Sequence, residues 1–225
     1  MTTTSRQNNL LLNQLQCSSN QLTSLDVTNN ILLTSLNCSS NLLTNLNILS
    51  NILLTYVICN NNQLSLISLI NLTELYYLNV GYNLLIAVDL TVNLKIAYLY
   101  VNDNNLTYLI VLANTKLIQV SCYNNYISTL DLDSLPLLRI LDCQNNGLTT
   151  LTATTANLTT LNCRFNNLAS INISNSTLLT TLHCNGNLLT SLNVSNNIAL
   201  KTIYCGTNIL TSIDITNNVE LQILS

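Results

Sequence analysis

The stretch Leu36-Asn37-Cys38-Ser39-Ser40-Asn41-Leu42-Leu43-Thr44 decides the fold, because close copies of it recur along the chain. Cysteine marks one position of each copy, at steps of 21 residues with a single step of 20, and valine takes its place in two copies. The ten marks are Cys17, Cys38, Cys59, Val80, Val101, Cys122, Cys143, Cys163, Cys184 and Cys205. A fixed period of this length is typical of a solenoid, in which one structural unit is stacked many times.

Asparagine and aliphatic residues hold fixed places relative to each mark. An asparagine stands three residues after every mark: Asn20, Asn41, Asn62, Asn83, Asn104, Asn125, Asn146, Asn166, Asn187 and Asn208. Aliphatic side chains stand two and five residues before the mark and five, eight and ten residues after it, with Ala153 as the one small residue. Alternation with period 2 around the mark predicts a short strand with one buried face. The asparagine predicts a turn in which an amide side chain satisfies backbone groups.

The remaining residues of each repeat return the chain to the next strand. They also alternate with period 2 and contain few helix formers, so we expect an extended or irregular back side with little or no α-helix. One repeat cannot bury its own leucines, and stacking of about ten repeats is therefore expected to build one core behind a parallel β-sheet of about ten strands. We predict a polar segment over 1–9 and a single solenoid over 10–225, whose C-terminal end carries no polar cap in this sequence.

The composition excludes several functional classes. The chain has 225 residues, of which only 7% are charged, and its net charge is −3 with 6 Lys+Arg. So few cations argue against nucleic-acid binding, which needs a basic stripe. No window approaches the length of apolar sequence that a membrane span requires. A single histidine leaves little material for catalysis, so we expect neither an enzyme nor a cofactor.

The pattern L-x-x-L-x-C/V-x-x-N-x-L resembles the signature of the leucine-rich-repeat family. Its 21-residue form with cysteine is similar to internalin J and related bacterial surface proteins, over roughly residues 10–224. Leu182-His183-Cys184-Asn185-Gly186-Asn187 carries the pattern as well as the opening stretch does. The resemblance implies a right-handed solenoid with a concave sheet, a role in adhesion or protein recognition, and an extracellular or cell-surface location. No signal peptide is visible in this chain.

The eight cysteines are predicted to form a structural ladder. A short secreted domain with this many cysteines usually contains disulfides, but here all of them share one inward-facing column. Val80 and Val101 occupy the same column, which indicates that the position requires volume rather than sulfur. A linear ladder does not converge on a metal ion, so no metal site is expected. A reactive-thiol or metal role remains the alternative.

The side chains that flank each inward strand residue should point out of the sheet. Five tyrosines gather there in repeats three to six: Tyr56, Tyr77, Tyr98, Tyr100 and Tyr123. Tyrosine offers a rigid apolar ring and a hydroxyl, which favours it at binding interfaces. We interpret these residues as the centre of a patch that binds a protein or glycan. The alternative is a cross-strand aromatic ladder that stabilises the sheet.

A second polar cluster combines Asp142, Arg164 and His183 in repeats seven to nine, with Arg139 nearby in the sequence. Asp142 and His183 lie two repeats apart in one column, about 10 Å at the usual strand spacing, which is too far for a catalytic hydrogen bond. The cluster is interpreted as the polar rim of a binding face or as plain solvated surface.

Aspartates recur nine residues after the mark, as Asp26, Asp89, Asp131 and Asp214. Calcium prefers carboxylate oxygens, but asparagine fills the same position in other repeats, so side-chain bonding within the turn is the favoured role. A threonine column six residues after the mark could bind an ordered lattice such as ice or a polysaccharide, although Ser65, Ile86, Ser128 and Ala169 interrupt it.

Two features leave the functional class open. An apolar flank replaces polar residues on the return side of repeats three to five, at Leu66, Ile70, Ile86, Val92, Ile110 and Leu112. It is either a second contact surface, a region of relaxed patterning or an area that another segment covers. The second feature is the open last layer of the solenoid, which suggests possible end-to-end self-association. A structural, self-assembling solenoid is therefore the alternative to a recognition module.

Overall fold

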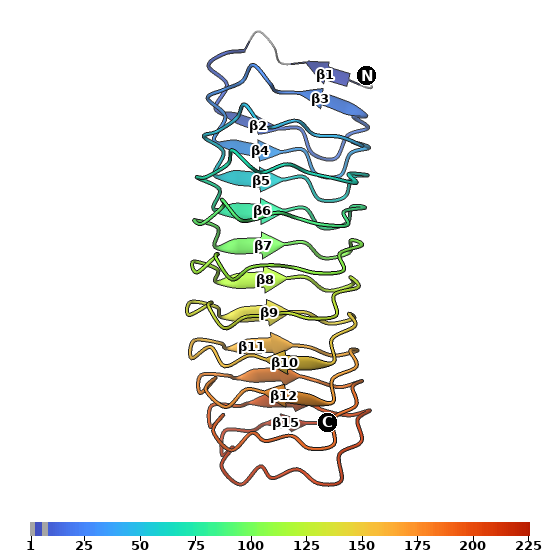
Figure 1. The fold of residues 1–225 in the computed structure, drawn as a ribbon, viewed down its shortest axis with the longest axis vertical. Coiled ribbons are helices and arrows are strands. Elements are labelled where there is room, and N and C mark those ends of the chain that lie inside the picture. Colours follow the sequence, from blue (N-terminus) through green and yellow to red (C-terminus); the bar gives the residue numbers. More distant parts are fainter. Residues whose placement is uncertain (1–2, 6–8) are drawn as a thin grey trace. The chain divides into compact units, whose positions relative to one another are not determined.

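The computed structural model describes residues 3–5 and 9–225. Residues 1–2 and 6–8 of the predicted polar segment lie outside the described residues. The chain divides into two compact units, Met1–Thr107 and Tyr108–Ser225. Both units consist of short parallel strands joined by irregular segments, and no helix occurs among the described residues (Figure 1).

In the first unit, one strand from each repeat enters a parallel sheet in sequence order. These strands are β2 (Gln14–Gln16), β4 (Ser35–Asn37), β5 (Tyr56–Ile58), β6 (Tyr77–Asn79) and β7 (Tyr98–Tyr100). On the return side, β1 (Thr3–Ser5) pairs in parallel with β3 (Ser24–Asp26). Three of the nine residues in the predicted N-terminal segment thus extend the return side of the first repeat.

The second unit repeats this arrangement. Its parallel sheet strands are β8 (Gln119–Ser121), β9 (Ile140–Asp142), β11 (Thr160–Asn162), β13 (Thr181–His183), β14 (Thr202–Tyr204) and β15 (Ile223–Leu224). On the return side, β10 (Thr150–Thr152) pairs in parallel with β12 (Ser170–Asn172). Elsewhere the described part of the return side has isolated bridges, such as Asn193 with Asp214.

The strands form where the sequence predicts them. In the sheet strand of each repeat, the middle residue points into the core. Leu36 and Leu78, for example, have no exposed surface. The residues on either side of it point outward and keep part of their exposure. The predicted parallel β-solenoid with an extended or irregular return side is therefore confirmed.

The asparagine three residues after each mark joins neighbouring repeats. Asn41 is 6% exposed, and its Nδ2 donates to the carbonyl oxygens of Cys17 at 2.9 Å and Cys38 at 3.0 Å. Its Oδ1 accepts a hydrogen bond from the backbone N–H of Leu22 at 3.0 Å. Equivalent bonds recur at Asn83 and Asn187. One side chain thus satisfies backbone groups of two repeats, as the sequence predicts.

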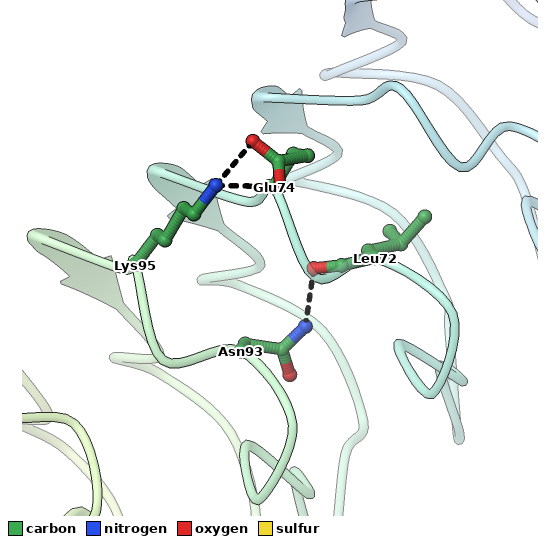
Figure 2. A network of polar contacts seen from close by, with 4 residues as sticks. All are labelled: Leu72, Glu74, Asn93 and Lys95. Atoms are coloured by element: carbon green, nitrogen blue, oxygen red, sulfur yellow. Dashed lines mark hydrogen bonds and ion pairs between the residues drawn. The ribbon is translucent and has the colours of Figure 1, made fainter.

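A second column of buried asparagines runs along the return side, thirteen residues after the mark. Its members are Asn30, Asn51, Asn93, Asn114, Asn197 and Asn218. The Nδ2 of Asn93 donates to Leu72 O at 2.8 Å and to Leu69 O at 3.2 Å (Figure 2). Beside it, Lys95 Nζ contacts both carboxylate oxygens of Glu74 on the exposed turn, at 2.5 and 2.6 Å. The sequence analysis did not predict this second ladder.

The turn after each mark requires a left-handed backbone. The residue two positions after the mark has φ between 51° and 69° in all ten repeats, although only Gly186 among them is glycine. Non-glycine residues adopt this region at a cost of about 1–2 kcal/mol each. The asparagine hydrogen bonds that follow the turn offset this cost, because they would be lost in any other turn conformation.

Candidate functional site

The cysteines line the core and do not form a reactive site. All eight are free thiols, and only Cys17 and Cys205 are partly exposed. Burial raises the pKa of Cys59, Cys122 and Cys163 to about 12, so these thiols stay protonated and unreactive at neutral pH. Among the described residues, no group of three or more His, Cys, Asp or Glu could hold a metal ion. The eight cysteines are thus free thiols, six of them fully buried in the core.

We use the term strand face for the outward-pointing side chains of the sheet strands. Tyr56, Tyr77 and Tyr98 stand in register on neighbouring strands of the first unit. The ring centroids of Tyr56 and Tyr77 lie 5.9 Å apart with an interplanar angle of 23°, and those of Tyr77 and Tyr98 lie 6.1 Å apart at 32°. The Tyr100 ring lies 5.3 Å from that of Tyr77. The structure thus brings four of the five predicted tyrosines together.

Tyr76 joins these four residues, although the sequence analysis did not name it. Its ring packs edge-on against Tyr56 at 5.9 Å and against Tyr98 at 5.6 Å. Tyr76 lies one residue before β6, outside the outward-pointing columns, and the adjacent Tyr77 was the only available signal. We call Tyr56, Tyr76, Tyr77, Tyr98 and Tyr100 the tyrosine cluster. The fifth predicted residue, Tyr123, belongs to the second unit and is partly buried there.

Two hydroxyl groups of the cluster, those of Tyr76 and Tyr100, have a raised pKa. Partial loss of solvent and a side-chain hydrogen bond to Tyr98 raise the pKa of Tyr76. Partial burial, together with the nearby Tyr77 hydroxyl, raises the pKa of Tyr100. Tyr56 is 42% exposed and Tyr76 is 37% exposed, whereas the other three rings are partly buried. The cluster therefore presents part of its aromatic surface to solvent, chiefly at Tyr56 and Tyr76.

The second predicted group lies on the strand face of the second unit. Asn162 stands between Asp142 and His183, since it pairs with both on neighbouring strands. Gln144 bridges the charges, because its Nε2 donates to Asp142 Oδ2 at 3.3 Å while its Oε1 accepts a bond from Arg164 Nε. The predicted separation of Asp142 from His183 is thus seen in the structure, and Arg139 is exposed on the preceding turn.

Burial dominates the titration of this group. Loss of solvent raises the pKa of Asp142, although Gln144, Asn162 and Arg164 each act to lower it. Loss of solvent and the Arg164 charge lower the pKa of His183. The His183 ring also packs edge-on against Tyr204 at 4.8 Å. A hollow of about 440 Å³ beside these residues is lined by Arg164, His183, Asn185, Tyr204, Gly206, Thr207 and Ser225.

The aspartate column forms turns. Asp26 Oδ1 accepts bonds from the N–H of Thr28 at 3.0 Å and from its hydroxyl at 2.7 Å. Asp89 and Asp214 have the same bonds to Thr91 and Thr216, which lower the pKa of both carboxyls. The predicted turn role is confirmed.

The apolar flank is exposed in the first unit. Leu66, Ile70 and Ile86 expose 63%, 63% and 68% of their surface, whereas Val92 is partly buried. Ile110 and Leu112 are exposed on the second unit. Because these side chains are exposed to solvent, no described segment of their own unit covers them. A helix long and apolar enough to cross a membrane is not found in the described part of the chain.

The fold is shared with solved leucine-rich-repeat structures. No protein-family model matches the chain, and no curated protein matches it. The functional domain of InlJ from Listeria monocytogenes, which includes a cysteine ladder, is 29% identical with a TM-score of 0.75. The match covers 98% of this chain and 59% of that one, so the chain spans about three fifths of the InlJ domain.

Two further structures show the same fold. The leucine-rich-repeat protein LIC12759 from Leptospira interrogans has 20% identity and a TM-score of 0.76, over 95% of this chain and 68% of that one. The ectodomain of the receptor kinase GASSHO1/SCHENGEN3 from Arabidopsis thaliana has 25% identity and a TM-score of 0.78, over 88% of this chain and 27% of that one. The period, the solenoid and the column of buried thiols agree with these matches, and the chain thus has the leucine-rich-repeat fold, with a column of buried cysteines similar to the cysteine ladder of the InlJ domain.

Proposed function

We propose that this chain is a non-catalytic recognition module that binds a protein or glycan through its strand face. The tyrosine cluster is the contact centre on the first unit, and Tyr123 is a further contact residue on the second unit. The observation that carries the proposal is the cluster itself. Five aromatic rings gather on a face that has no need for burial, and two of them expose more than a third of their surface.

The chemistry of the cluster suits recognition better than catalysis. Its rings contact one another, so a partner meets a preformed surface and little side-chain entropy is lost on binding. Tyrosine at such a surface contributes apolar area together with hydrogen bonds. Asn162 separates Asp142 from His183, so these two residues do not form the hydrogen-bonded pair that a catalytic triad would require.

Structural neighbours support a binding role. The Arabidopsis ectodomain was solved in complex with CASPARIAN STRIP INTEGRITY FACTOR 2, and the InlJ domain is described as functional. We therefore infer adhesion or recognition at a cell surface or outside the cell, with no nucleic acid as partner. Asp142, Arg164 and His183 form the polar rim of the binding face in this proposal.

Binding of the purified chain to arrays of extracellular proteins and glycans tests the proposal. The double variant Tyr77→Ala/Tyr98→Ala is expected to lose any specific signal, while Thr160→Ala/Thr181→Ala, in the same column of the second unit, keeps it. Circular dichroism shows whether both variants are folded. A signal that survives the tyrosine changes, or that both variants lose equally, contradicts the assignment of the site. End-to-end assembly is the competing hypothesis, and sedimentation velocity over a range of concentrations detects it.

A further inference from the structure

The tyrosines in register form a row of stacked rings along the sheet. Tyr77 has Tyr56 on one side and Tyr98 on the other, at 5.9 and 6.1 Å between ring centroids. The Tyr56 and Tyr77 rings are stacked, with an interplanar angle of 23°, whereas the Tyr77 and Tyr98 rings are tilted at 32°. The middle ring thus has a ring on each side, which leaves the rings at the ends of the row as the places where a ligand can stack.

The row ends at Tyr56 with a step. The next strand, β4, places Ser35 in register with Tyr56, and β2 places Gln14 in register with Ser35. The ring contacts of Tyr56 come from Tyr76 and Tyr77, which both lie on the side away from Ser35. Tyr56 is the most exposed ring of the cluster at 42%. The Tyr56 ring is thus much larger than the neighbouring Ser35 side chain, and its face toward β4 extends beyond Ser35. We call this difference in height the step.

The surroundings of the step are uncharged, with polar side chains on β2 and β4 and the apolar Ile58 on β5. Ile58 lies two residues after Tyr56, points to the same side of the sheet and is partly buried. The five sheet strands of the first unit, QLQ, SLN, YVI, YLN and YLY, contain no acidic or basic residue. A charged group would lose its water here without gaining a partner of opposite charge, which is costly. The occupant is therefore neutral, and a flat ring matches the face of Tyr56.

We propose that the step between Tyr56 and Ser35 binds one uncharged aromatic side chain of a protein partner, which stacks on Tyr56 as the next ring of the row. This inference rests on the proposed function and names the chemistry that the tyrosine cluster recognises. It also assigns Ser35 a role, since a larger side chain at this position would fill the step.

N-acetyltryptophanamide is a suitable probe, because the chain contains no tryptophan. Titration of the ¹⁵N-labelled chain is expected to shift the amide resonances of Ser35, Tyr56 and Ile58. In Ser35→Tyr the new ring occupies the step, and binding of the probe weakens at least tenfold. In Gln14→Tyr a ring is added on the far side of the step, so the probe is enclosed between two rings and binds about two- to tenfold more tightly.

Thr181→Tyr is the matched control, because it adds a tyrosine in the same column of the second unit and should leave binding of the probe unchanged. N-acetylleucinamide, which has no ring, should bind at least severalfold more weakly. Absence of shifts at Tyr56, shifts centred on Tyr98, or equal binding to the Ser35→Tyr variant overturns the proposal. The proposal is also overturned if methyl glucoside shifts these resonances and N-acetyltryptophanamide does not. The array experiment with Tyr77→Ala/Tyr98→Ala is independent of these outcomes, so the proposed function can stand when the step fails.

Discussion

The Oδ1 atom of Asn41 accepts a hydrogen bond from the backbone N–H of Leu22 at 3.0 Å, although the two residues belong to different repeats. The same side chain donates to carbonyl oxygens of both repeats. Side-chain bonds of this kind replace the backbone bonds that a helix would supply on the return path. The ladder therefore stabilises the turn of its own repeat and also links that repeat to the preceding one.

Replacement of Asn41 by alanine is expected to lower the free energy of unfolding by about 2–4 kcal/mol. The change leaves several buried backbone groups without partners, and each costs about 1–3 kcal/mol before water enters. Urea denaturation followed by circular dichroism measures the loss. Asn45, an exposed residue of the same repeat, provides the control, and Asn45→Ala should cost under about 0.5 kcal/mol. Similar losses in the two variants would show that the ladder bonds contribute little.

Cys59 should tolerate valine better than serine. Val80 occupies the equivalent position one repeat later and is fully buried, as Cys59 is. Cys59→Val keeps an apolar side chain of similar volume and is expected to cost under about 1.5 kcal/mol. Cys59→Ser buries a hydroxyl among aliphatic groups and is expected to cost about 1–3 kcal/mol. Thermal denaturation compares the two variants, and a serine variant as stable as the valine variant would contradict the apolar role of the column.

The buried thiols predict a loss of stability at alkaline pH. The pKa of Cys59, Cys122 and Cys163 is about 12 in the folded chain against an ordinary value of 9.0. The unfolded chain therefore releases these protons first, and stability falls as pH rises from about 9 toward about 12. Urea midpoints measured across this range should decrease. The triple variant Cys59→Val/Cys122→Val/Cys163→Val should flatten the decrease, and an unchanged slope in that variant would assign the effect to other groups.

The sequence predicts the sheet strands and the turn asparagines because these features recur in all ten repeats, and it predicts the thiol column because only Val80 and Val101 replace cysteine there. It does not predict the second asparagine ladder. Leu72, Leu135 and Ser176 replace asparagine in that column, and Thr155 takes its place twelve residues after Cys143, in the repeat that is one residue shorter. These interruptions hide the pattern. Ser176 Oγ still donates to the carbonyl oxygens of Ala153 and Thr155, which shows that the hydrogen bonds rather than the residue type are kept.

The tyrosine cluster was predicted in part. Residues in register on neighbouring strands follow from the period alone, so Tyr56, Tyr77 and Tyr98 could be placed together from the sequence. Tyr76 could not, because its contacts depend on how a ring at the strand entrance turns toward Tyr56 and Tyr98. The division of the chain into two units, which separates Tyr123 from the cluster, also has no signal in a uniform repeat.

Gly186 is the one turn glycine at a left-handed position, and Phe165 of the preceding repeat lies against it. A Cβ atom at Gly186 would lie 2.5 Å from Phe165 Cδ1, and φ at this residue is 69°. Gly186→Ala is therefore expected to cost about 1–3 kcal/mol, mainly through the collision with the ring. Left-handed strain alone accounts for the smaller part, because non-glycine residues such as Thr207 occupy the same turn position elsewhere.

The two contributions separate in a double-mutant cycle with Phe165→Ala. Once the ring is absent, Gly186→Ala should cost only about 1 kcal/mol, which is the strain of a left-handed alanine. The difference between the two backgrounds is expected to exceed about 0.5 kcal/mol, as it does for residues in direct contact. Urea denaturation of the unchanged chain, the two single variants and the double variant measures the four free energies of unfolding. Equal costs of Gly186→Ala in both backgrounds would show that Phe165 moves aside freely and that glycine is selected here by the backbone alone.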